Sequence, residues 1–102
     1  MDIERAIRMA VDTGKVEFGS HKALKRAMLG SAKVLVISNN CPAEAKADLL
    51  RYASLSGVPI ITYSGTGLEL GTVCGKPFTV SALSVVEAGD SNILDAASGA
   101  GA

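Results

Sequence analysis

The sequence is poor in the residues on which metal sites and most catalytic centres depend. Its 102 residues contain a single histidine, His21, and two cysteines, Cys41 and Cys74. Two cysteines are too few for a disulfide framework, and these two do not form a C-x-x-C pair. We therefore predict no metal site and expect both cysteines to pack as small apolar side chains.

Long apolar stretches are also missing. No run approaches the ~20 consecutive apolar residues that a membrane-spanning helix needs. The first ten residues, MDIERAIRMA, carry acidic side chains and lack the apolar core of a signal peptide. Together with the small number of cysteines, these features predict a cytoplasmic protein with no membrane partner.

The common catalytic motifs are absent as well. There is no G-x-S-x-G nucleophile elbow. Glu44 and Asp48 lie one helical turn apart, a spacing more typical of a solvated helix face than of an acid–base pair. The residues alone therefore provide no catalytic constellation.

The strongest enzymatic alternative is a phosphate-binding loop. Gly65, Gly67 and Gly71 lie between a predicted strand and a predicted helix, where backbone N–H groups can bind an anion. The spacing fits neither G-x-G-x-x-G nor G-x-x-x-x-G-K-[ST]. Thr66 and Glu69 also fit a helix capping box, and Glu69 would repel a phosphate. A nucleotide-binding enzyme that uses residues 65–71 stays as the weaker alternative.

Charged residues are balanced in number but not in distribution. Ten Lys and Arg offset ten Asp and Glu. Between residues 13 and 41 bases outnumber acids, whereas from residue 77 onward every charged residue is acidic. One part of the surface is therefore predicted to be positive, and such a patch favours a polyanionic partner even at zero net charge.

Helical and strand patterns alternate along the whole chain. Glycine, proline and asparagine turns separate them, without a repeat or a linker. We predict one domain over residues 1–102, with residues 98–102 frayed. Its fold should be α/β, a three-layer α/β/α sandwich around a small mixed sheet of about four strands. The predicted helices cover residues 2–14, 20–30, 42–57 and 66–75, with a last one capped by Asp90 or Ser91; the predicted strands cover residues 15–18, 33–38, 58–63 and 79–87.

Helix signals refine this outline. Asp2 and Ser20 are candidate N-caps, and Pro42 suits the first position of a helix. In the helix over residues 20–30, the positions expected to face the core are Leu24, Ala27 and Met28. The outward face then carries Lys22, Lys25 and Arg26, because positions three and four apart are neighbours on a helix.

Three predicted turns could form one binding surface. They cover residues 19–20, 39–42 and 75–79, and they meet at one end of the sheet if the last strand runs antiparallel to the first two. The positive end of the helix after Ser20 would point to the same place. Asn39 and Asn40 can read base edges, and Phe78 offers a face for an unstacked base. The alternative readings are a solvated basic face, asparagines that only form a turn, and a Phe78 side chain folded onto the core.

The motifs in these segments resemble a known family. The segment ELGTVCGK followed by VSALSVVEAG is similar to the C-terminal signature of the archaeal and eukaryotic large-subunit ribosomal proteins of the L-thirty-e type. These proteins belong to a superfamily that binds kink-turn RNA. NNCPA and RYASLSGVPI also match, and an earlier signature is similar at Thr13, Gly19, Leu24, Lys25, Gly30, Lys33 and residues 35–37. The resemblance extends from the first helix to Ile93.

The resemblance implies a structural constituent of the large ribosomal subunit without catalysis or a cofactor. It would bind a helix–internal loop–helix bend, the kink-turn, in ribosomal RNA, and would be a monomer when free. Some relatives also bind their own transcript, and the alternative within the superfamily is a protein of a guide-RNA particle. The short N-terminal segment is more similar to archaeal members.

The candidate RNA-binding residues fall into three groups. The kinked backbone would be docked by Gly19, Ser20, His21, Lys22 and Lys25. Bases or sugars would be contacted by Asn39 and Asn40, and a phosphate by Lys46. The remaining candidates are Gly75, Lys76, Phe78, Thr79, Val80 and Ser81, with Phe78 and Val80 packing on an extruded base.

Three positions depart from the family pattern. His21 replaces a lysine, arginine or glutamine, Met28 replaces a basic residue, and Ala45 stands where relatives can carry arginine. Each change removes or weakens a phosphate contact. They are expected to alter the strength and salt dependence of binding, and neutral His21 still donates a hydrogen bond.

Overall fold

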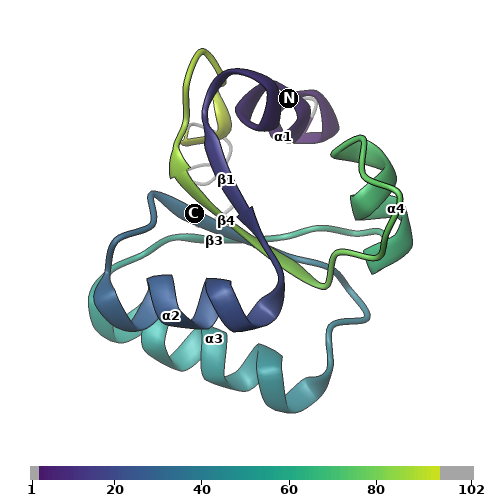
Figure 1. Cartoon of the computed structure of the whole chain (residues 1–102). Helices are drawn as coiled ribbons and strands as arrows, with labels where there is room; N and C mark the ends of the chain where they lie inside the picture. Colours follow the sequence, from purple (N-terminus) through teal and green to yellow (C-terminus); the bar gives the residue numbers. More distant parts are fainter. Residues whose placement is uncertain (1–2, 95–102) are drawn as a thin grey trace.

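The computed structural model describes residues 3–94, so the expected cap Asp2 and the expected fraying of residues 98–102 lie outside the described part. Helices and strands alternate as predicted (Figure 1). In order they are α1 (Ile3–Thr13), β1 (Lys15–Phe18), α2 (Ser20–Leu29), β2 (Val34–Ile37), α3 (Ala43–Ser56), β3 (Ile60–Thr62), α4 (Gly67–Val73) and β4 (Ala82–Glu87). No helix within residues 3–94 is long and apolar enough to cross a membrane.

The strands form one mixed sheet in the order β1-β4-β2-β3. β2 and β3 are parallel, whereas β4 runs antiparallel to both β1 and β2. Figure 1 shows α1 and α4 on one face of the sheet and α2 and α3 on the other. The three-layer α/β/α prediction is therefore confirmed.

The sheet is buried on both faces at its centre. Val34 and Val36 of β2 belong to the cluster shared with α1 and α4, whereas Leu35 and Ile37 belong to the cluster shared with α2 and α3. Successive side chains of a strand point to opposite faces, so an uninterrupted apolar run serves both clusters. This is the arrangement that the non-alternating sequence predicts for β2.

The observed boundaries correct several predictions. The predicted strand over residues 58–63 shortens to β3, because the N–H of Val58 bonds back to the carbonyl of Ala53 and completes the end of α3. The predicted strand over residues 79–87 begins only at Ala82, since β1 and β2 provide ladder partners only from there on. Residues 79–81 therefore form a segment that leads into β4.

Helix starts are displaced by one residue in two places. Gly19, not Ser20, is the N-cap of α2, and Pro42 is the N-cap of α3 rather than its first helical residue. At α4 the Thr66 hydroxyl accepts from the N–H of Glu69, as the capping box predicts. Ser91 accepts from the N–H of Ile93 at 3.5 Å and so caps the last turn.

The predicted orientation of α2 is wrong at one position. Met28 is 55% exposed, and the buried positions are Ala23 and Ala27, with Leu24 partly buried. Their small side chains allow α2 to pack closely beside α3, which a pattern of large apolar residues does not reveal. Arg26 is also not free on the outer face, because its Nε donates to the Glu17 carboxylate at 2.6 Å.

Candidate nucleic-acid interface

The antiparallel course of β4 brings the predicted turns to one end of the sheet. Phe18, the last residue of β1, pairs with Leu83, and Ile37, the last residue of β2, pairs with Ala82. The chain therefore enters β4 beside the points where it leaves β1 and β2 (Figure 1). We call this the turn end; it consists of residues 19–20, 38–42, 64–67 and 75–81.

Backbone hydrogen bonds join these segments directly. The N–H of Gly19 donates to the carbonyl of Ala82 at 2.8 Å, and the N–H of Ser38 donates to the carbonyl of Ser81 at 2.9 Å. The first residue of β4 is thus bonded to the turn after β1, and the residue before it is bonded to the turn after β2. The spatial condition for a shared surface is met.

The two asparagines partly serve as scaffold. The Asn40 side-chain oxygen accepts from the N–H of Gly67 at 2.9 Å and from the Ser38 hydroxyl at 3.1 Å. The Asn39 side-chain nitrogen donates to the carbonyl of Ser64 at 2.6 Å. A ligand would therefore meet the NH₂ group of Asn40 and the side-chain oxygen of Asn39, both on exposed residues.

The turn over residues 64–67 belongs to the turn end, although sequence reasoning treats it only as a possible nucleotide loop. Asn39 also donates its backbone N–H to the carbonyl of Gly65 at 3.0 Å. The sequence carries a signal for this placement. A strand, a helix and a second strand in succession predict two parallel strands, as β2 and β3 are, and the carboxyl ends of parallel strands lie at the same edge of a sheet.

Gly19 has a conformation that favours glycine, and it leaves open space. Its φ of 108° lies in the region that residues with a side chain rarely adopt, and a Cβ built there meets no atom within 4 Å. Gly19 accepts the first helical bond, from Ala23 at 3.1 Å, so the N–H groups that begin α2 lie beside this space. A phosphate can approach the backbone here.

The segment over residues 75–81 carries the aromatic surface. Phe78 is 48% exposed and packs edge-on against Phe18, with ring centroids 6.3 Å apart. The Phe78 side chain is thus neither fully exposed to solvent nor buried in the core. The prediction that Val80 packs on an extruded base is wrong. Val80 is 1% exposed and packs in the core, where no base can reach it.

Two glycines of the alternative nucleotide loop are explained by packing. A Cβ on Gly71 would lie 2.1 Å from the carbonyl oxygen of Phe78, and one on Gly67 would lie 2.7 Å from the Thr79 side chain. Both glycines allow α4 to approach the segment before β4. Their spacing therefore needs no bound phosphate to account for it.

The candidates differ in exposure, and His21, Lys22, Lys25 and Lys46 lie within α2 and α3, the helices that follow the turns after β1 and β2. Those that are exposed are His21, Lys22, Lys25, Asn39, Asn40, Gly75, Phe78 and Thr79. Those that are half-buried are Gly19, Ser20, Lys46, Lys76 and Ser81. The cation of Lys46 is near enough to Cys41 to oppose the rise that burial causes in the pKa of that thiol.

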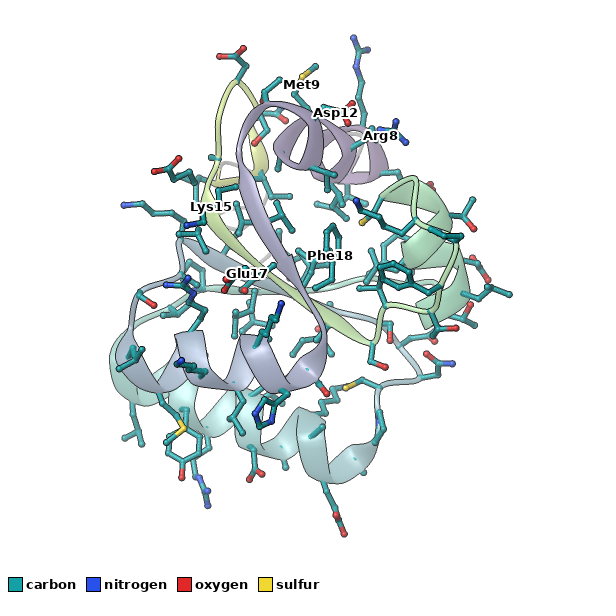
Figure 2. All side chains as sticks on the ribbon, in the orientation of Figure 1. Arg8, Met9, Asp12, Lys15, Glu17 and Phe18 are labelled. Carbon is teal, nitrogen blue, oxygen red and sulfur yellow. The ribbon has the colours of Figure 1, made fainter. Side chains whose placement is uncertain are left out.

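Arg26 contributes less charge to a ligand than its position suggests. Its bond to Glu17 lowers the pKa of that carboxyl and raises the pKa of the guanidinium, so both groups stay charged as a pair. Figure 2 shows Glu17 directed toward α2 and Phe18 directed to the opposite face of the sheet. The positive charge that α2 offers to a ligand is therefore that of Lys22 and Lys25, both exposed.

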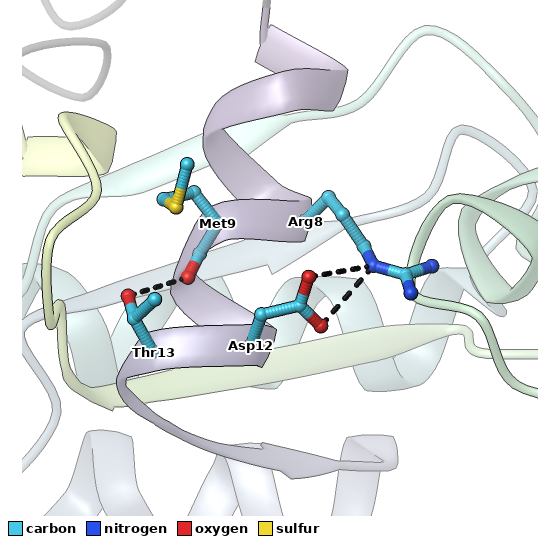
Figure 3. Close-up of polar contacts among 4 residues, drawn as sticks. All are labelled: Arg8, Met9, Asp12 and Thr13. Carbon is cyan, nitrogen blue, oxygen red and sulfur yellow. Dashed lines mark hydrogen bonds and ion pairs between the residues drawn. The ribbon is translucent and has the colours of Figure 1, made fainter.

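Arg8 adds a base that sequence reasoning does not single out. Its Nε donates to both oxygens of Asp12, at 3.0 and 3.2 Å, one helical turn further along α1 (Figure 3). A Cβ on Gly75 would lie 2.5 Å from Arg8 Nη1, so the guanidinium borders the turn before β4. Only the topology places α1 beside this turn.

Both cysteines are free, buried thiols. Burial raises the pKa of Cys74 to about 11 and also raises the pKa of Cys41. Within residues 3–94, no three His, Cys, Asp or Glu side chains are grouped so that they could hold a metal ion.

The turn end offers hydrogen-bond donors, positive charge and one aromatic face.

Comparison with known proteins identifies the family of this chain. Residues 1–95 match the family described as "Ribosomal protein L7Ae/L30e/S12e/Gadd45 family". The chain belongs to this family. It is 53% identical over 95 residues to the "Large ribosomal subunit protein eL30" of Methanosphaera stadtmanae, covering 93% of this chain and 97% of the relative. The protein of the same name from Methanopyrus kandleri is 44% identical over 93 residues, covering 91% and 85%.

A solved structure has the same fold at much lower identity. It is that of a protein with unknown function from Bacillus halodurans. The TM-score is 0.78 at 20% identity, and the match covers 94% of this chain and 95% of the other. The likeness supports the architecture alone.

Proposed function

We propose that this protein is a structural constituent of the large ribosomal subunit that binds a kink-turn in ribosomal RNA through its turn end. The observation that carries the proposal is the hydrogen-bonded union of the turns, with Phe78 half exposed beside them. Membership of a family with ribosomal proteins, and close relatives named as large-subunit proteins, supports the ribosomal part. The protein acts by binding, without catalysis or a cofactor.

The proposed contacts divide by chemistry. The start of α2, with Gly19, Lys22 and Lys25, meets the phosphates of the bent backbone, and Lys46 and Lys76 extend this positive rim. Asn39 and Asn40 hydrogen-bond to bases or sugars in the internal loop, and Phe78 packs on an extruded base. Phosphate contacts fix the position of the RNA, while the polar and stacking contacts select its shape.

Two alternatives differ in their expected partners. A protein of a guide-RNA particle would use the same turn end, and the RNA that copurifies from cells distinguishes it. A nucleotide-binding enzyme is disfavoured, because the N–H of Gly67 is already bonded to Asn40 and that of Glu69 to Thr66. We also propose the protein's own transcript as a second RNA target, and we propose that the free protein is a monomer.

A gel-shift experiment tests the proposal. One RNA carries a helix–internal loop–helix kink-turn, and a second RNA of equal length has its internal loop replaced by paired bases. We expect strong preference for the first RNA and copurification with large-subunit ribosomal RNA. Equal affinity for the two RNAs would overturn the kink-turn assignment, and a thermal shift with nucleotides alone would favour the enzyme.

A further inference from the structure

Phe18 connects two parts of the candidate interface, the start of α2 and the segment before β4. The RNA contacts proposed above do not include Phe18. It is the last residue of β1, and it immediately precedes Gly19. Figure 2 shows its side chain on the sheet face that carries α1 and α4, and it packs against the core cluster on that face. Its backbone therefore leads directly into the start of α2, while its ring faces the segment before β4.

Two residues of that segment contact the Phe18 ring. The Phe78 ring stands edge-on to it, at an interplanar angle of 84° and a centroid distance of 6.3 Å. The ammonium of Lys76 lies over the ring, 5.1 Å from its centroid. Edge-to-face pairs and cation–π contacts both favour particular orientations of the groups involved.

We infer that Phe18 is a positioning residue for RNA recognition, which rests on the proposed function. It holds the half-exposed ring of Phe78 and the charge of Lys76 in the orientation in which RNA meets them. A side chain at the surface without such a partner samples several rotamers, and ordering it on binding lowers affinity. Phe18 provides that order in the free protein.

The substitution Phe18→Leu removes the ring and keeps an apolar side chain. We expect binding to kinked RNA to weaken by about 3- to 10-fold, the range that an aromatic pair typically contributes. In a Phe78→Ala background the same substitution should have much less effect, because Phe18 acts mainly through Phe78. In the free protein, side-chain couplings of Phe78 measured by NMR should become averaged.

Val16→Ala is the matched control. Val16 lies on the same strand face and packs against the same core cluster. Its truncation should lower the melting temperature while leaving RNA affinity unchanged. If Phe18→Leu binds kinked RNA as tightly as the wild type, and the wild type prefers kinked to unkinked RNA, this inference alone is overturned. If the wild type binds kinked and unkinked RNA equally well, the proposed function is overturned together with the inference.

Discussion

The side-chain oxygen of Asn40 accepts a hydrogen bond from the backbone N–H of Gly67, 2.9 Å away, and joins the turn after β2 to the start of α4. The parallel pairing of β2 with β3 brings these two positions to the same edge of the sheet. Asn40 is therefore both a candidate RNA contact and a structural link. The two roles can be separated by substitution.

Asn40→Asp should retain stability but weaken RNA binding. The carboxylate can still accept from Gly67 and from the Ser38 hydroxyl, and a negative charge is favourable at a helix start. It cannot donate to a base, and it repels phosphate. Asn40→Ala should in addition lower the free energy of unfolding by about 1 kcal/mol, because the Gly67 N–H loses its partner. Urea titrations and RNA-binding isotherms of both variants check this; if the two bind RNA as tightly as the wild type, Asn40 is scaffold only.

Phe78→Ala should weaken binding to kinked RNA by about 1–3 kcal/mol, which is roughly 5- to 150-fold, because base stacking is lost. The fold should persist, since the side chain is 48% exposed. Fluorescence anisotropy with labelled RNA measures the change. Leu68→Ala is the matched control, because Leu68 is also exposed but lies on α4 outside the candidate set. An equal loss in both variants would remove Phe78 from the interface.

Lys22→Ala should lower affinity and reduce the slope of log affinity against log salt by about 1, because one fewer counterion is released. Affinities measured over a series of salt concentrations provide this slope. Lys33→Ala serves as the control, because exposed Lys33 precedes β2 and lies at the opposite end of the sheet. A slope that does not change in Lys22→Ala would identify Lys22 as part of a solvated face.

Gly71→Ala should destabilise the protein by about 2 kcal/mol or more. Its Cβ would lie 2.1 Å from the carbonyl oxygen of Phe78, so α4 or the segment before β4 must move. Helix propensity alone predicts the opposite sign, a gain of about 1 kcal/mol. The sign of the change in a denaturation experiment thus reports whether this close approach exists.

Alkaline pH should destabilise the fold partly through Cys74. Burial raises the pKa of this thiol from 9.0 to about 11, so its contribution to stability is complete below pH 9 and is lost as the pH rises toward 11. We expect the free energy of unfolding to fall over this range by roughly 2 kcal/mol from this group. Cys74→Ala should show a shallower fall; an identical pH profile would contradict the assignment.

The order of the elements could be predicted because their boundaries carry local chemistry. Gly30 and Gly57 end α2 and α3 in the left-handed conformation, and Thr66 caps α4 with its side chain. Each signal depends on neighbours within a few residues, so the sequence alone reveals it. The candidate turns could be recognised for the same reason.

Other features depend on partners that are distant along the chain. The apolar character of Met28 suggests burial, but close packing of α2 beside α3 is achieved by small residues, Ala23 and Ala27. The burial of Val80 and the contact between Phe18 and Phe78 arise only when the segment before β4 crosses the end of β1. Such relationships follow from the topology and not from local patterns.

The central claim is that the separate turns form one RNA-binding surface, and an NMR titration with kinked RNA tests it most directly. We predict that the backbone amide signals of Gly19, Asn40 and Phe78 shift together with the same dissociation constant. Signals at the other end of the sheet, from Gly14, Lys33 and Gly89, should stay in place. Shifts confined to residues 65–71, or concentrated at that other end, would contradict the account.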